Sequence, residues 1–158
     1  MTPEARKRFK RRKWKHLGPS SSFIWGGLDE ITDRVILVES IGDSLMLREH
    51  GVPETLCMFG TTVSEALMGW IIAHNPRQII ISTNLDEEKQ MGTRMGRPGQ
   101  EAAVRAQKML GKFFDDGVVS IVHPEANDWG DSTPEQIQAA FGPQIPLDTN
   151  PKTEILSP

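Results

Sequence analysis

Apolar runs alternate with helix-forming segments through most of this chain, and that alternation limits the folds that it can adopt. The apolar runs predict strands over residues 34–39, 56–59, 77–83 and 118–122. The intervening and following segments predict helices over residues 42–50, 62–74, 100–115 and 133–141. Strand–helix alternation is typical of a parallel sheet, and continuous apolar strands indicate burial on both faces. We therefore predict an α/β domain with a mainly parallel four-stranded sheet and helices on both faces.

Local signals predict where some of these helices begin. Thr62 and Glu65 have the spacing of a capping box, in which each side chain binds the backbone N–H of the other residue. Thr133 followed by Pro134 is a second helix start, because proline is favoured at the first helical position. A glycine-rich stretch over residues 92–99 precedes the third helix, and we expect it to form a loop.

The charge is divided unequally along the chain. Eight of the 18 Lys and Arg residues lie within residues 1–16 beside a single acidic residue, while the rest of the chain carries ten basic and twenty acidic residues. Such a basic arm can bind nucleic acid without sequence preference, and Phe9 and Trp14 within it can stack on bases. The residues predicted to contact nucleic acid are Arg8, Lys10, Arg11, Arg12, Lys13 and Lys15. The alternative is a solvated terminus without a ligand.

Length and composition set further limits. The 158 residues suffice for one domain with a substantial core. We expect that domain over residues 23–142, with a basic arm and linker over 1–22 and a loose, proline-rich tail over 143–158. Cys57 is the single cysteine, so neither a disulfide framework nor a cysteine zinc site is expected. A single cysteine fits a cytoplasmic location. No apolar run is long enough to span a bilayer, so we expect no membrane partner.

Acidic residues follow two of the apolar runs directly. Glu39 ends the first run, with Asp43 four residues later, and Asn84 and Asp86 follow the third run. In open α/β sheets, ligands bind outside the carboxyl ends of the strands, where carboxylates from separate strands can share a divalent cation. Mg²⁺ prefers such oxygen ligands. Asn84 stands where a third carboxylate would be natural, and its amide brings no negative charge.

Most of these acidic positions also have a simpler interpretation. Asp43 lies near a helix start, where a carboxylate is favoured as a cap. Asp86 opens an acidic turn that solvent alone could stabilise, and Asp128 lies in a similar acidic loop after the fourth run. Glu39 has no such local role, because a charge directly after four apolar residues is costly inside a sheet. Glu39 is therefore the strongest candidate for a functional carboxylate.

In combination, these motifs resemble the Toprim fold, which bacterial-type primases, type IA and type II topoisomerases and some nucleases share. The apolar strand followed by Glu39 and then Asp43 is similar to the first Toprim motif. The strand that ends in Asn84-Leu85-Asp86 is similar to the second, which reads Asp-x-Asp in the family. Gly96 or Gly99, before the next helix, resembles the family's glycine at a helix start. The segment around Asp128 resembles the phage-primase pattern. The resemblance covers about residues 33–142.

The resemblance implies a Toprim-like phage DNA primase or primase fragment. Such an enzyme is a nucleotidyltransferase, a DNA-directed RNA polymerase that makes RNA primers on a single-stranded DNA template from nucleoside triphosphates during DNA replication. Its cofactor would be Mg²⁺ or Mn²⁺, and its catalytic residue would be Glu39. The implied metal site consists of Glu39, Asp43, Asn84, Asp86 and Asp128. A replicative helicase on a separate chain would be a partner, and a phage-encoded protein would act in the host cytoplasm.

Other functions stay open from the sequence. With Asn84 in place of an aspartate, the domain could be a catalytically weakened Toprim module that binds DNA or assembles a replisome. A Toprim nuclease would use the same carboxylates. An unrelated α/β module of the response-regulator kind is also open, although it would require a lysine after the fourth strand that we do not find. A topoisomerase is not expected, because the chain has no tyrosine to act as the nucleophile.

Overall fold

The structure is a computed structural model, and it describes residues 22–142. Within these residues, four parallel strands form the central sheet in the order β2-β1-β3-β6. The strands are β1 (Arg34–Val38), β2 (Thr55–Cys57), β3 (Gln78–Ser82) and β6 (Val119–Ile121). Each strand overlaps a predicted apolar run, and the predicted α/β class is confirmed. The predicted basic arm and C-terminal tail fall outside the described residues, apart from residue 22.

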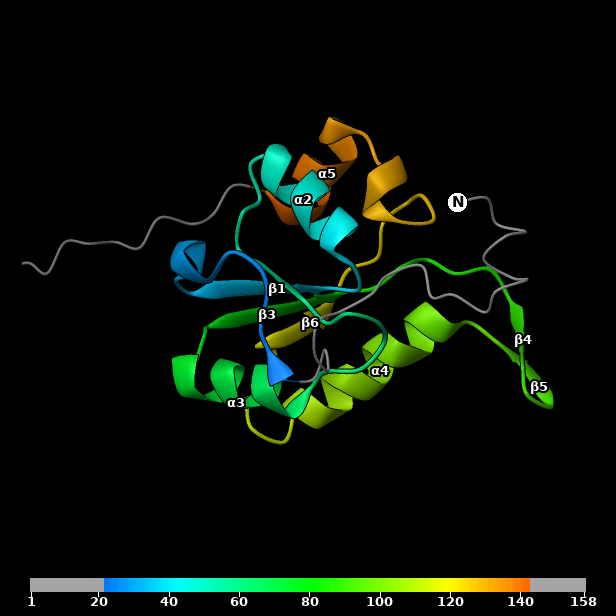
Figure 1. Ribbon diagram of the computed structural model, residues 1–158, viewed down its shortest axis with the longest axis horizontal. Helices are drawn as coiled ribbons and strands as arrows, with labels where there is room; N and C mark the ends of the chain where they lie inside the picture. Colours follow the sequence, from blue (N-terminus) through cyan, green and yellow to red (C-terminus); the bar gives the residue numbers. More distant parts are fainter. Residues whose placement is uncertain (1–21, 143–158) are drawn as a thin grey trace, which may run out of the picture.

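Helices cover both faces of this sheet (Figure 1). On one face lie α2 (Ile41–Glu49), α5 (Pro134–Phe141) and the short 3₁₀ helix η3 (Trp129–Asp131), and on the other lie α3 (Glu65–His74) and α4 (Pro98–Leu110). Successive side chains of β1 alternate between the two layers. Val35 and Leu37 pack with α3 and α4, whereas Ile36 and Val38 pack with α2 and α5. This alternation explains why the strand is apolar at every position.

The structure corrects some of the predicted helix ends. The N-cap of α3 is Ser64, whose side chain accepts a hydrogen bond from Leu67 N–H, so the predicted capping box at Thr62 is wrong. Helix α4 begins at Pro98 and ends at Leu110, which is earlier at both ends than predicted. The capping box of α5 is present between Thr133 and Gln136, with Pro134 at the first helical position as predicted.

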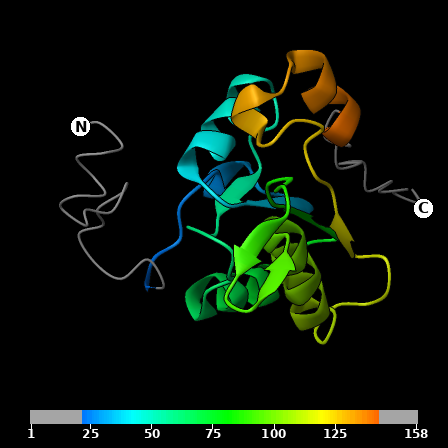
Figure 2. The same ribbon diagram turned by 90° about the vertical axis from the view of Figure 1, so that its right-hand side faces the viewer.

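The predicted glycine-rich loop contains an antiparallel hairpin instead. Its strands are β4 (Lys89–Met91) and β5 (Arg94–Gly96), and Gly92 takes a positive φ of 65° in the turn between them. The hairpin projects beyond the sheet beside the N-terminal end of α4, as Figures 1 and 2 show. Its residues are mostly exposed, so no apolar run marks its strands in the sequence.

The β2 edge of the sheet is partly covered by the chain before β1. Gly26 forms an isolated antiparallel bridge to Leu56 of β2. Directly before β2, Glu54 is fully buried and pairs with Arg34, an ion pair that no sequence pattern predicted.

None of the helices within residues 22–142 is long and apolar enough to cross a membrane.

Candidate active site

Parallel pairing brings the two acidic segments to the same edge of the sheet. Strands β1 and β3 are neighbours, with Val38 opposite Ser82, so the residues after each strand leave the sheet side by side. The backbone N–H of Asn84 donates a hydrogen bond of 3.0 Å to Glu39 Oε1. This contact joins the glutamate that follows β1 directly to the segment that follows β3.

Glu39 is a partly buried carboxylate in an acidic environment. Burial raises the pKa of its carboxyl above the ordinary value, and the hydrogen bond from Asn84 N–H opposes that rise. The negative charges of Asp86 and Asp43 raise the Glu39 pKa further, whereas Lys89 lowers it. A carboxyl whose pKa moves toward neutrality is better suited to accept and return a proton at physiological pH.

Asp43 is almost fully buried, with 4% of its surface exposed, and it links two elements. The N-cap of α2 is Ser40, whose hydroxyl accepts from Asp43 N–H at 3.1 Å and donates to Asp43 Oδ2 at 2.6 Å. Asp43 Oδ1 accepts a hydrogen bond from Trp129 N–H at 3.2 Å, which ties α2 to η3. Burial raises the Asp43 pKa against the Ser40 hydrogen bond, and the charge of Asp128 raises it further.

Asp128 lies next along the same edge, but its side chain has a local role. It is the N-cap of η3, and its Oδ1 accepts a hydrogen bond of 3.1 Å from Asp131 N–H. Its charge acts on Asp43, which in turn acts on Glu39. Asp128 therefore belongs to the acidic edge electrostatically, while one of its oxygens is used to cap a helix.

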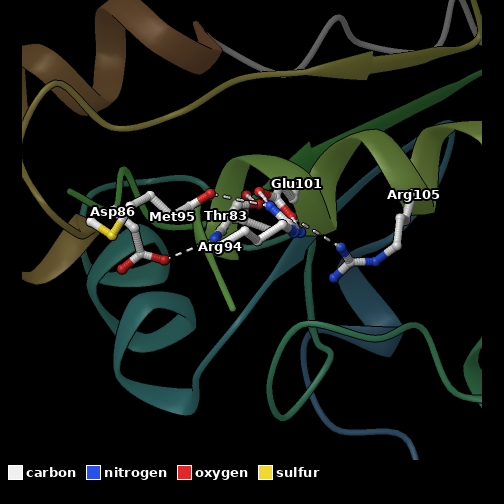
Figure 3. A network of polar contacts seen from close by, with 7 residues as sticks. Thr83, Asp86, Arg94, Met95, Glu101 and Arg105 are labelled. Carbon is white, nitrogen blue, oxygen red and sulfur yellow. Dashed lines mark hydrogen bonds and ion pairs between the residues drawn. The ribbon is translucent and has the colours of Figure 1, made fainter. Parts of the chain in front are cut away.

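Asp86 connects the end of β3 to the start of α4. Its Oδ2 accepts a hydrogen bond of 2.8 Å from Gly99 N–H, in the first turn of that helix (Figure 3). The N-cap residue itself, Arg97, makes no side-chain capping bond. Because the first N–H groups of a helix lack partners within the helix, Asp86 caps α4 from a distant part of the chain, where a negative charge is also favoured.

Gly99 is the glycine that this arrangement requires. A Cβ atom at this position would lie 2.2 Å from the carbonyl oxygen of Asn84 and 3.1 Å from Asp86 Oδ2. The hydroxyl of Thr83 donates to the Gly99 carbonyl at 2.8 Å (Figure 3). Of the two glycines considered from the sequence, Gly99 is therefore the one that packs against the segment around Asp86.

Lys89 is a site residue that the sequence analysis missed. Its Nζ lies 2.6 Å from Asp86 Oδ1, and its charge also acts on Glu39. The sequence shows a lysine three residues after Asp86. Its side chain could be placed at the edge of the sheet only once the β4–β5 hairpin was known. The ammonium group stands beside two of the carboxylates predicted to bind metal.

The hairpin that carries Lys89 is attached to α4 by an ion pair. Arg94 Nη1 and Nη2 donate to Glu101 Oε1 and Oε2 at 2.8 and 2.6 Å, and Arg105 Nη1 lies 3.9 Å from Glu101 Oε2 (Figure 3). The hydrogen bond from Arg94 holds the Glu101 pKa well below its ordinary value, at about 2. This two-point contact joins β5 to the first turns of α4.

Buried polar contacts hold the loop after β6 against the end of β3. The indole N–H of Trp129 donates to Ser82 Oγ at 2.9 Å, and the Ser82 hydroxyl donates to the Val122 carbonyl at 2.8 Å. Trp129 is almost completely buried and contacts the ring of Phe141. A tryptophan within an acidic loop was the available signal for this anchoring role, and we did not predict it.

The donor set of the edge suits a hard cation, but it is not arranged as a closed metal site. Asn84 Oδ1 is buried and has no hydrogen-bond partner among the described residues. Carboxylate and amide oxygens are the ligands that Mg²⁺ prefers. However, within residues 22–142 no group of three or more His, Cys, Asp and Glu side chains is placed to hold a metal ion. The six predicted nucleic-acid contacts of the basic arm lie outside the described residues.

The parallel sheet order and the helices on both faces match the Toprim-like core of DnaG primases in fold. Among solved structures, the fold is similar to the DnaG catalytic core, with a TM-score of 0.55 and 15% identity over 80% of this chain and 38% of that chain. It is also similar to the DnaG primase catalytic domain bound to single-stranded DNA, with a TM-score of 0.56 and 15% identity over 79% of this chain and 39% of that one.

A third similar structure contains the zinc-binding and RNA polymerase domains of the Aquifex aeolicus primase. Its TM-score is 0.51, with 16% identity over 84% of this chain and 33% of that chain. The chain thus spans 33 to 39% of the length of the structures that it matches, and at this identity the likeness establishes the fold alone. No protein-family profile matches the sequence, and no curated protein matches it.

Proposed function

We propose that the protein is a Toprim-type DNA primase of the phage kind, or a part of one. It would synthesise RNA primers on single-stranded DNA from nucleoside triphosphates during DNA replication. The observation that carries this proposal is the position of Glu39 and Asp86 at adjacent strand ends, in a fold similar to the DnaG catalytic core. A solved relative of this fold is a primase bound to single-stranded DNA, which supports the choice of template.

Mg²⁺ or Mn²⁺ is the proposed cofactor. Asp86 and Glu39 would supply charged oxygens, and the unpartnered Asn84 Oδ1 would supply a neutral one. Asp43 and Asp128 would add negative charge nearby, since their oxygens already accept hydrogen bonds from Ser40, Trp129 and Asp131. When bound, the metal would neutralise charge on the triphosphate during nucleotidyl transfer.

The chain's own groups would position the reactants and move the proton. Glu39, with its raised pKa, would accept the proton of the attacking primer hydroxyl as a general base. The basic arm, with the six Lys and Arg residues named above, would bind the phosphates of the template. A separate replicative helicase would be the partner, and a phage-encoded protein would work in the host cytoplasm.

A primer-synthesis assay tests this proposal. The full chain is incubated with single-stranded DNA and labelled ribonucleotides, with Mg²⁺, with Mn²⁺ and with EDTA. Short RNA products that require the metal support a primase. The absence of product from folded protein at every metal concentration would contradict the enzymatic proposal for this chain.

The second candidate is a DNA-binding module whose catalysis is weakened. Two observations favour it: Asn84 replaces a charged ligand, and Lys89 is ion-paired to Asp86. The Asn84→Asp variant separates the candidates, because it restores a charge without altering the backbone N–H that binds Glu39. Tighter Mn²⁺ binding with no RNA product in either protein favours the module. Cleavage of the labelled DNA in the same reactions would instead indicate a nuclease.

A further inference from the structure

Lys89 is the one described lysine or arginine that forms an ion pair with the acidic edge. Among residues 22–142, the ion pairs of the other basic side chains go to glutamates and aspartates elsewhere in the fold. Lys89 Nζ lies 2.6 Å from Asp86 Oδ1, and its charge also acts on Glu39. The Asp86 side chain is 13% exposed and that of Lys89 is 56% exposed, so the ammonium approaches the carboxylate from the solvent side.

The chain segment that carries Lys89 begins and ends beside Asp86. Asp86 Oδ2 is hydrogen-bonded to Gly99 N–H at 2.8 Å, and Gln100 Nε2 donates to the Asp86 carbonyl at 3.0 Å. Residues 87–98 therefore form a closed excursion whose two ends meet at Asp86. Its hairpin is fixed to α4 through Arg94 and Glu101, so the position of Lys89 is set by a folded element.

Charge balance gives this lysine a role. Glu39, Asp43, Asp86 and Asp128 lie along one edge, where their negative charges repel one another. A cation beside Asp86 relieves part of that repulsion. A divalent ion would do the same. It would need Asp86 Oδ1, which the ammonium now contacts, since Oδ2 accepts a hydrogen bond from Gly99 N–H. The ion and the ammonium cannot both lie against that oxygen, because like charges this close repel strongly.

We propose that Lys89 is the resident counter-cation of the acidic edge, which occupies Asp86 when no divalent ion is bound and must leave it before one can bind. This inference rests on the metal site of the proposed function. Lys89 acts through Asp86 and is thus a positioning residue. Metal binding and the position of the Lys89 side chain are then linked, since each state of Asp86 favours one position of Lys89.

Mn²⁺ binding to the full chain tests the proposal, measured at low salt by the loss of the free-ion signal in electron paramagnetic resonance. Lys89→Gln should bind Mn²⁺ roughly fivefold more tightly than the wild type, because the competing cation is gone. Lys89→Arg keeps the charge and should restore near-wild-type affinity. Lys108→Gln is the matched control, since Lys108 is exposed in the last turn of α4 and changes the net charge equally.

The remaining outcomes separate this inference from the metal site itself. Equal affinities for wild type and Lys89→Gln, or an equal shift in Lys108→Gln, would overturn the counter-cation role while leaving the metal site intact. If neither the wild type nor any variant binds Mn²⁺, the proposed metal site is refuted. Thermal unfolding in EDTA then tests the counter-cation role of Lys89 by itself. Lys89→Gln should then unfold at a lower temperature than wild type, and this difference should vanish in an Asp86→Asn background. An unchanged midpoint would overturn the proposal.

Discussion

Glu39 Oε1 accepts a hydrogen bond from the backbone N–H of Asn84 across the adjacent ends of β1 and β3, at 3.0 Å. The side chain of the first acidic segment is thereby held by the main chain of the second. Because the donor is a backbone group, the contact does not depend on which side chain stands at position 84. The charge of the site can therefore be changed at Asn84 without releasing Glu39.

Glu39→Gln should strongly reduce the proposed primer synthesis while preserving the fold. The amide oxygen of glutamine can still accept the hydrogen bond from Asn84 N–H, but the side chain can no longer accept a proton. We expect activity to fall roughly 100-fold or more, with a thermal midpoint close to that of the wild type. The matched control is Glu88→Gln, which removes an exposed carboxylate nearby. Equal loss in both variants would contradict a specific role for Glu39.

Gly99→Ala should destabilise the protein and displace Asp86. The new Cβ would lie 2.2 Å from the carbonyl oxygen of Asn84, which is main chain and cannot rotate away. We expect the free energy of unfolding to fall by about 2 kcal/mol or more, measured by urea denaturation. Gly69→Ala is the control, because nothing lies within 4 Å of its Cβ position in α3. That variant should be stabilised by about 0.5–1 kcal/mol, and similar losses in the two would refute the steric argument.

Asp43→Asn should change how stability depends on pH. Burial raises the Asp43 pKa in the folded protein above its unfolded value, so the folded state binds the proton more tightly. This contribution to stability is complete below the unfolded pKa and is lost as the pH rises through the folded pKa. Asparagine does not titrate, so the variant does not lose this stability as the pH rises. The difference in free energy of unfolding, variant minus wild type, should therefore increase from acid to neutral pH. Urea denaturation across that range measures the difference, and parallel profiles would contradict the assignment.

Arg34→Met should strongly destabilise the fold because it leaves the buried Glu54 carboxylate without its cationic partner. Glu54 is completely buried, and Arg34 donates to Glu54 Oε1 from Nε at 2.6 Å and to the Phe141 carbonyl at 2.6 Å. Removing one partner of a buried ion pair typically costs about 3–5 kcal/mol. Arg77→Met is the control, since its pair with Asp33 is exposed at 3.8 Å and should change stability by less than about 1 kcal/mol. Equal effects in chemical denaturation would show that the buried pair is not special.

Signals between neighbouring residues predicted the strands and one helix start. The strands were predictable because burial on both faces demands unbroken apolar residues, as in Val35–Val38. The start of α5 was predictable because Pro134 follows Thr133 and suits the first helical position. Thr62 gave a wrong prediction, because its spacing from Glu65 matches a capping box whereas the N-cap of α3 is Ser64. Strands β4 and β5 have three mostly exposed residues each and leave no apolar pattern.

The sequence by itself determined the class of fold and the two acidic segments, because hydrophobic periodicity and strand-end carboxylates are properties of neighbouring residues. Only the tertiary structure decided which atoms meet: the Glu39 carboxylate with Asn84 N–H, the Asp86 carboxylate with Gly99 N–H and Lys89, and Asp43 with Trp129 N–H. These contacts join segments up to 86 residues apart, and they depend on strand order and on a hairpin that projects beyond the sheet. The charge balance of the site therefore followed from the packing, and the motifs alone could not supply it.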